Sequence, residues 1–93
     1  MKIVVTGSSG FIGSNVVQTF GKSNDVVGLD IVDGENTKII IDCKSSELTE
    51  LLEWSGIDLV IDCAARTDLG GTSLSDYDDN FKVIERLIGI CNQ

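Results

Sequence analysis

The sequence predicts an α/β fold whose parallel sheet forms the first half of a doubly wound arrangement. Two observations indicate this fold. Four short apolar runs are continuous rather than alternating, which is typical of strands that helices cover on both faces. Helical patterns or a loop separate the runs, and right-handed crossovers between them give an expected strand order of 3-2-1-4.

The four predicted strands are rich in valine, isoleucine and leucine. They span residues 3–5, 26–29, 39–41 and 59–61. No repeat or low-complexity tract divides the chain. We therefore expect residues 1–93 to form a single domain, of a size that buries about 60–65% of its unfolded surface.

The segment after the first strand predicts an amphipathic helix. Ile12, Val16 and Phe20 recur every four residues, and Gly21 offers a stop after them. Residues 31–38, after the second strand, show no helical pattern and are expected to form a connecting loop.

Two further helices are predicted in the second half of the chain. Residues 46–55 carry leucines at helical spacing, with acidic residues where the helix dipole favours them, and Gly56 ends the segment. The last helix follows a capping-box pattern formed by Ser75 and Asp78. We expect it to present one apolar face, made of Tyr77, Phe81, Ile84, Ile88 and Cys91.

Composition argues against several partners and sites. The net charge is −8 and the seven basic residues are scattered, so neither a nucleic acid nor an anionic membrane is an expected partner. No apolar run approaches the roughly 18 residues of a membrane span, and the chain opens into a strand rather than a signal peptide. Three cysteines without a CxxC pattern, and no histidine, argue against a disulfide framework or a zinc site. We expect a cytoplasmic protein with reduced thiols.

A glycine-rich turn follows the first strand, where residues 6–13 read TGSSGFIG. Gly7 suits a tight turn, Gly10 lets the backbone approach a pyrophosphate, and Gly13 lets the helix pack close to the sheet. The free N–H groups of the helix N-terminus would then bind the phosphates. The alternative is a plain strand-to-helix loop made of small residues.

Asp30 closes the second strand, 17 residues after Gly13. A carboxylate in this place can accept hydrogen bonds from the adenosine ribose hydroxyls, and it would repel a 2′-phosphate. Ile31 and the next two residues include no arginine to neutralise such a phosphate, so NAD is favoured over NADP. The alternative is a solvated acid at a strand end.

The ends of the third and fourth strands supply further candidates. Asp42 and Cys43 could border the adenine, although Asp42 could equally be a loop or capping acid. The fourth strand ends in Cys63-Ala64-Ala65, whose small side chains leave room for a cofactor or simply pack well. All these elements fall at carboxyl ends of strands, where open α/β sheets bind their ligands.

Together these stretches resemble the extended short-chain dehydrogenases/reductases, in the NAD-dependent epimerase/dehydratase group that acts on nucleotide sugars. The TGSSGFIG turn is similar to the TGxxGxxG signature of that family. VVGLD at residues 26–30 resembles its second strand, and YDDN at residues 77–80 resembles its Y-x-x-N pattern. VIDCAA at residues 60–65 resembles its fourth strand, where Asp62 stands in the place that more often holds histidine.

The resemblance implies a Rossmann-type NAD-binding domain and assigns roles around the cofactor. Phe11 and Ile12 would lie under the pyrophosphate, Thr67 would line the way to the nicotinamide with the end of the fourth strand, and Asn80 would support the cofactor. Arg66 and residues 68–73 would lie near the nicotinamide and the substrate. The full set of expected cofactor-binding residues is Gly7, Ser9, Gly10, Phe11, Ile12, Gly13, Asp30, Ile31, Asp42, Cys43, Cys63, Ala64, Ala65, Thr67 and Asn80.

The catalytic residues of the family that this chain resembles are not expected in it. The family uses a Tyr-x-x-x-Lys pair, whereas Tyr77 is the one tyrosine here and Phe81 stands four places on. The chain is therefore either a truncated gene product or, as we expect, an N-terminal fragment of an enzyme that also carries a nucleotide-sugar site. The alternatives are a non-catalytic nucleotide-binding or interaction module and, with less support, a flavodoxin-like or receiver-type domain. The open edge of the fourth strand predicts self-association, including a homodimer.

Overall fold

A four-stranded parallel sheet forms the centre of the protein, in the order β3-β2-β1-β4. The structure, a computed structural model, describes residues 1–64 and 78–92, with side chains at 1–64 and 82–92. The strands are β1 (Lys2–Thr6), β2 (Asp25–Asp30), β3 (Ile39–Ile40) and β4 (Leu59–Asp62). The predicted α/β class and the predicted 3-2-1-4 strand order are both confirmed.

The register of the sheet brings the carboxyl ends of its strands together. Thr6 at the end of β1 pairs with Leu29 on one side and with Asp62 on the other. Ile3 to Val5 in the middle of β1 are fully or almost fully buried, because β1 is central and covered on both faces. The carboxyl end of the sheet beside Thr6 is therefore built on its central, buried strand.

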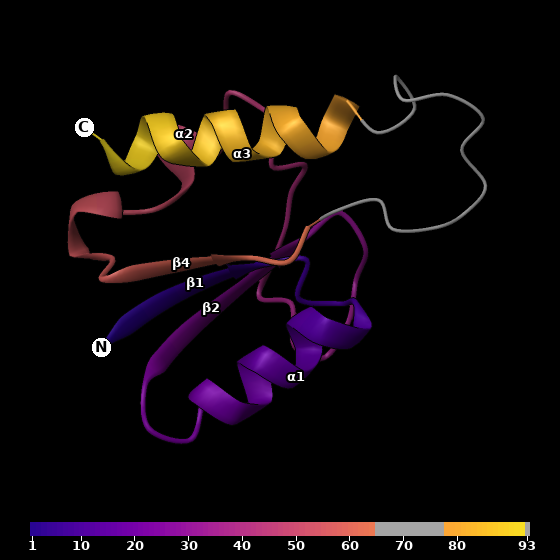
Figure 1. Cartoon of the computed structure of the whole chain (residues 1–93). Helices are drawn as coiled ribbons and strands as arrows, with labels where there is room; N and C mark the ends of the chain where they lie inside the picture. Colours follow the sequence, from indigo (N-terminus) through magenta and orange to yellow (C-terminus); the bar gives the residue numbers. More distant parts are fainter. Residues whose placement is uncertain (65–77, 93) are drawn as a thin grey trace.

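The helices cover both faces of the sheet (Figure 1). Helix α1 (Phe11–Phe20) lies on one face, while α2 (Leu48–Leu51), the 3-10 turn η1 (Trp54–Gly56) and α3 (Asp78–Cys91) lie on the other. Residues 31–38 contain no helix or strand, as predicted. None of the helices in the described part of the chain is long and apolar enough to cross a membrane.

The second predicted helix is much shorter than expected. Residues 46–55 were expected to be helical, but α2 covers Leu48–Leu51 and Leu52 already has extended angles, φ −132° and ψ 154°. The Trp54 indole N–H donates to the carbonyl oxygen of Leu48 at 2.9 Å. In a longer helix that carbonyl would accept the backbone N–H of Leu52. The indole N–H takes the place of this donor, and the helix ends after one turn.

The described members of the apolar face predicted for the last helix do not pack on the sheet, while Tyr77 and the side chain of Phe81 lie outside the described residues. Ile84 and Ile88 are 43% and 55% exposed, and Cys91 is exposed as well. The residues that pack on the sheet are Val83, Leu87 and Ile90. Two apolar stripes run side by side along α3, and periodicity alone does not say which of them faces the sheet. The Ser75 end of the expected capping box lies outside the described residues.

Helix α1 also packs differently from its apolar pattern. Its buried residue is Gly13, while Ile12 and Phe20 at the two ends of the predicted stripe are exposed. Gly21 follows the helix with φ −65°, a right-handed conformation that donates its N–H to Val17. The helix lies close to the end of β1 at Gly13, and Val16 and Val17 farther along it are half-buried.

Candidate functional site

The glycine turn between β1 and α1 needs glycine for geometric reasons. Gly7 has φ +71°, and a Cβ atom on it would lie 2.5 Å from the carbonyl oxygen of Cys63. A Cβ atom on Gly13 would overlap the carbonyl oxygen of Gly7. These two glycines let β1, the start of α1 and the end of β4 approach one another closely.

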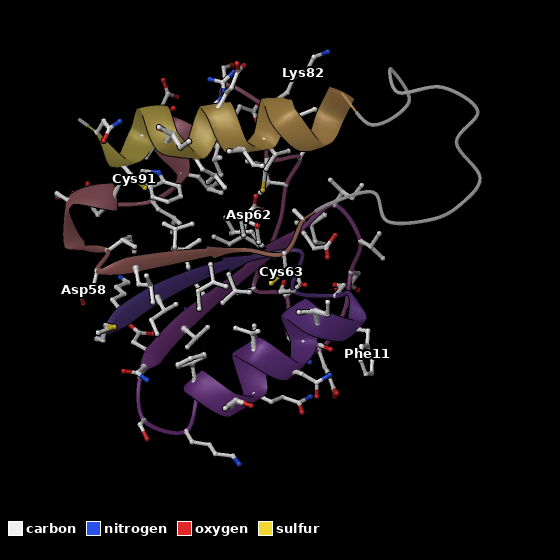
Figure 2. All side chains as sticks on the ribbon, in the orientation of Figure 1. Phe11, Asp58, Asp62, Cys63, Lys82 and Cys91 are labelled. Carbon is white, nitrogen blue, oxygen red and sulfur yellow. The ribbon has the colours of Figure 1, made fainter. Side chains whose placement is uncertain are left out.

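Gly10 stands in a more open place than its two partners. A Cβ atom on it would meet one atom of the described structure within 4 Å, the Gly7 carbonyl oxygen at 3.3 Å. Gly10 is the N-cap of α1, and neither a capping side chain nor an acidic residue of the described chain occupies the first turn. Phe11 is 86% exposed and projects outward from that turn (Figure 2). The positive end of the helix dipole is therefore open to an anion.

Asp30 ties the end of β2 to this turn. Its carboxylate accepts the backbone N–H of Ser9 at 2.9 Å on one oxygen and that of Val32 at 3.1 Å on the other. The next residue, Ile31, is exposed. The structure thus brings the predicted phosphate turn and the predicted ribose carboxylate into direct contact.

Thr6 organises the end of β4, where Cys63 and Ala64 were predicted to line the cofactor. The buried Thr6 hydroxyl donates to Asp62 at 2.5 Å and accepts the N–H groups of Cys63 and Ala64 at 3.2 and 3.3 Å. Ala64 N–H also approaches the Asp62 carboxylate at 3.1 Å. Asp62 stands where the family that the chain resembles more often has histidine. Its hydrogen bonds help to fix the backbone at the end of β4, beside Cys63 (Figure 2).

Asp42 and Cys43 occupy different environments. The exposed Asp42 carboxylate accepts the Lys44 N–H at 2.9 Å and lies 3.7 Å from the Lys44 ammonium, as a loop acid does. Cys43 is buried in the core. Burial, together with the nearby carboxylates of Asp62 and Asp42, raises the pKa of the Cys43 thiol to about 11. Burial and Asp62 also raise the pKa of Cys63.

Some of the predicted site residues lie outside the part of the chain that the structure describes. Ala65, Arg66 and Thr67, with residues 68–73, lie outside the described residues. Asn80 lies in α3, but its side chain is not among those described.

Ser8 and Thr37 also support the turn through their hydroxyl groups, and neither was predicted, whereas Ser9 was predicted as a cofactor-binding residue. Ser8 and Ser9 contact Thr37 through their side chains, at 2.5 and 2.6 Å. Thr37 lies 28 residues from Ser9, in a loop without a motif, so no spacing rule could have paired them. The signal available in the sequence was the pair of adjacent serines inside the glycine turn.

The chain matches the sequence profile of the NAD dependent epimerase/dehydratase family over residues 3–93. It belongs to that family. The family is NAD-dependent by its description, and the match includes the glycine turn, Asp30 and the end of β4. No curated protein sequence matches the chain.

Solved structures of epimerases have the same fold. UDP-glucuronic acid 4-epimerase from Bacillus cereus, in complex with NAD, is 30% identical with a TM-score of 0.77, and the match covers 98% of this chain and 35% of that one. UDP-N-acetylglucosamine 4-epimerase from Bacillus cereus is 28% identical with a TM-score of 0.79, covering 98% and 32%. L-threonine dehydrogenase from Phytophthora infestans, at 22% identity and a TM-score of 0.76, shares the fold over 97% and 32%. The chain therefore spans about a third of the length of these structures.

The described residues place an uncapped helix N-terminus beside a carboxylate. No group of three or more histidine, cysteine, aspartate or glutamate side chains in the described part of the chain could hold a metal ion. The epimerase/dehydratase glycine turn instead offers an uncapped helix N-terminus with a carboxylate beside it. A phosphate and a sugar diol match these two neighbouring groups.

Proposed function

We propose that this chain binds NAD across the carboxyl ends of its strands, as the cofactor-binding part of a nucleotide-sugar epimerase or dehydratase. The observation that carries the proposal is the hydrogen bond from Ser9 N–H to Asp30 at 2.9 Å. It fixes a carboxylate beside an uncapped helix N-terminus, which is the arrangement that a dinucleotide needs for its ribose and pyrophosphate.

The pyrophosphate would lie over Gly10 and the first turn of α1. Gly10 has room for a ligand on its open side, and Phe11 and Ile12 are exposed around it. Gly7 and Gly13 have no side chains with which to contact the phosphates. Their close packing would instead keep the turn tight, so that its N–H groups point outward.

The adenosine ribose would bind at Asp30. Each carboxylate oxygen accepts one backbone N–H in the structure, and each has a further lone pair for a ribose hydroxyl. The Asp30 carboxylate would repel a 2′-phosphate, and residues 31–33 directly after it include neither lysine nor arginine to neutralise one. These features support NAD rather than NADP.

The remaining predicted contacts extend this path in both directions. Ile31, Asp42 and Cys43 would border the adenine, with Cys43 acting through the backbone because its thiol is in the core. Toward the nicotinamide, the proposed contacts are Cys63, Ala64, Ala65, Thr67 and Asn80.

Bound NAD supplies a nicotinamide that accepts and returns a hydride, and the residues of this chain would hold it in place. The substrate proposed for the whole protein is a nucleotide sugar, since the 4-epimerases of UDP-glucuronic acid and UDP-N-acetylglucosamine cover 98% of this chain. Proton transfer to the sugar would fall to residues other than the Tyr77 motif, which lacks the lysine of a YxxxK pair.

Calorimetric titration of the chain with NAD and NADP tests the proposal. Asp30→Ala should weaken NAD binding by about 1–3 kcal/mol, because charged hydrogen bonds to the ribose are lost. For the NAD titration alone, Asp33→Ala is a control from the same loop, since its carboxylate accepts the neighbouring Gly34 N–H rather than that of Ser9. Equal affinity of the unmodified chain for NAD and NADP would contradict the role of Asp30.

A further inference from the structure

A row of three hydroxyl groups connects the loop after β2 to the glycine turn. Ser8 Oγ lies 2.5 Å from Thr37 Oγ1, and Thr37 Oγ1 lies 2.6 Å from Ser9 Oγ. Ser9 Oγ in turn donates to the carbonyl oxygen of Val32 at 2.7 Å. The row therefore runs from a buried serine to the backbone of the loop.

The direction of every hydrogen bond in this row follows from counting protons. A carbonyl oxygen only accepts, so the single Ser9 hydroxyl proton goes to Val32. Thr37 must then donate to Ser9, and Ser8 must donate to Thr37. Hydroxyls aligned in one direction polarise one another, so the row is stronger as a unit than as separate pairs.

Two glycines allow the loop to come this close. A Cβ atom on Gly28 of β2 would overlap the carbonyl oxygen of Asn36 and would lie 2.7 Å from Ser8 Cβ. A Cβ atom on Gly34 would lie 2.7 Å from Ser9 Oγ. The loop thus packs against both serines of the turn, and Ser8 is fully buried beneath it.

The residues at the end of the row are those that hold Asp30. Ser9 N–H donates to Asp30 Oδ2, and Val32 N–H donates to Asp30 Oδ1. The hydroxyl bond between Ser9 and Val32 fixes the spacing of these two N–H groups. The carboxylate is consequently held at both oxygens by backbone that Thr37 keeps in place.

We propose that Thr37 is a positioning residue for Asp30, which it acts on through Ser9 and Val32; this role rests on the proposed NAD site. The hydroxyl of Thr37 bonds the hydroxyls of Ser8 and Ser9, while the Asp30 carboxylate accepts the N–H groups of Ser9 and Val32. Thr37 sets the orientation in which Asp30 meets the adenosine ribose, and so extends the determinants of cofactor affinity beyond the end of β2.

The first test is a double-mutant cycle measured by NAD titration of the 93-residue chain. Thr37→Val should weaken NAD binding about tenfold, because the aligned hydrogen bonds are lost, while Thr37→Ser should restore the affinity. In an Asp30→Ala background the Thr37→Val change should have little further effect, because its target is gone. Thr19→Val, at an exposed threonine of α1, is the control. Additive losses in the cycle would overturn the proposal.

The second test needs no cofactor. Amide hydrogen exchange of Ser9 and Val32 should accelerate in Thr37→Val while exchange in the centre of β1 stays unchanged. Ser9→Ala breaks the same row and serves if the threonine variant folds poorly. Unchanged exchange at Ser9 and Val32 overturns the proposal. An unmodified chain that fails to bind NAD would instead remove the proposed function, and the exchange data would still decide the role of Thr37.

Discussion

The glycine turn and the outer face of α3 differ in whether their surface groups have partners within the described chain. Around the turn, polar groups are matched to one another: Asp30 holds two N–H groups, and the hydroxyl row ends on a carbonyl. On α3, Ile84 and Ile88 are exposed and, with Val60 of β4, line an apolar hollow of about 430 Å³. The polar groups around the proposed NAD site are thus held in place by contacts within this chain, whereas the α3–β4 face leaves apolar side chains exposed that another protein surface could cover.

The largest expected effect comes from breaking the turn at Gly13. Gly13→Val should destabilise the fold by about 1–3 kcal/mol or more, because its side chain would overlap the Gly7 carbonyl on a backbone that cannot retreat. Urea unfolding followed by circular dichroism measures the change.

Gly89→Ala is the matched control in the other region. Gly89 lies in α3, and a Cβ atom there would meet nothing within 4 Å of the described structure. Alanine should therefore raise stability by about 0.5–1 kcal/mol through helix propensity. A Gly13→Val protein as stable as the parent would show that the close approach at the turn is not required.

The next effect concerns association through the α3–β4 face. We expect the chain to self-associate, because β4 is an edge strand and the apolar hollow adjoins it. Ile88→Glu should weaken dimerisation at least tenfold, as a charge would be buried on contact. Sedimentation over a range of concentrations measures it, with Ile40→Glu on the opposite edge of the sheet as control. A parent chain that stays monomeric at high concentration would refute the prediction.

The smallest expected effect concerns the thiols. Because burial raises the Cys43 pKa from its ordinary value of 9.0 to about 11, the folded state favours the neutral thiol. Its contribution to stability is complete below pH 9.0 and is lost as the pH rises toward 11. Unfolding free energies measured across this interval should fall less steeply in Cys43→Ala, and an equal slope would remove the assignment.

Alkylation at pH 8 compares the exposed cysteine of α3 with the cysteines of the core and of the end of β4. Exposed Cys91 on α3 should react first, partly buried Cys63 more slowly, and Cys43 slowest, because it is buried and its raised pKa leaves little thiolate. Mass spectrometry of the labelled peptides gives the order. Cys43 reacting as fast as Cys91 would mean that the core around it opens readily.

The sequence predicted the sheet because its strands are continuous runs of β-branched residues, a pattern with few alternatives. The glycine turn and Asp30 were found for a similar reason, since each lies directly after a predicted strand. The buried face of α3 was missed because two apolar stripes adjoin, and α2 was overextended because one indole bond ends it. The Thr37 row could not be read from spacing, since it joins residues brought together by the fold of the loop.

Mapping of NAD binding by amide chemical shifts tests the central claim most directly. We expect titration of the chain with NAD to shift the amide signals of residues 7–13 and 30–32 and to leave those of residues 84–91 on α3 unchanged. Absence of binding, or shifts concentrated on α3 with the glycine turn unaffected, would contradict it.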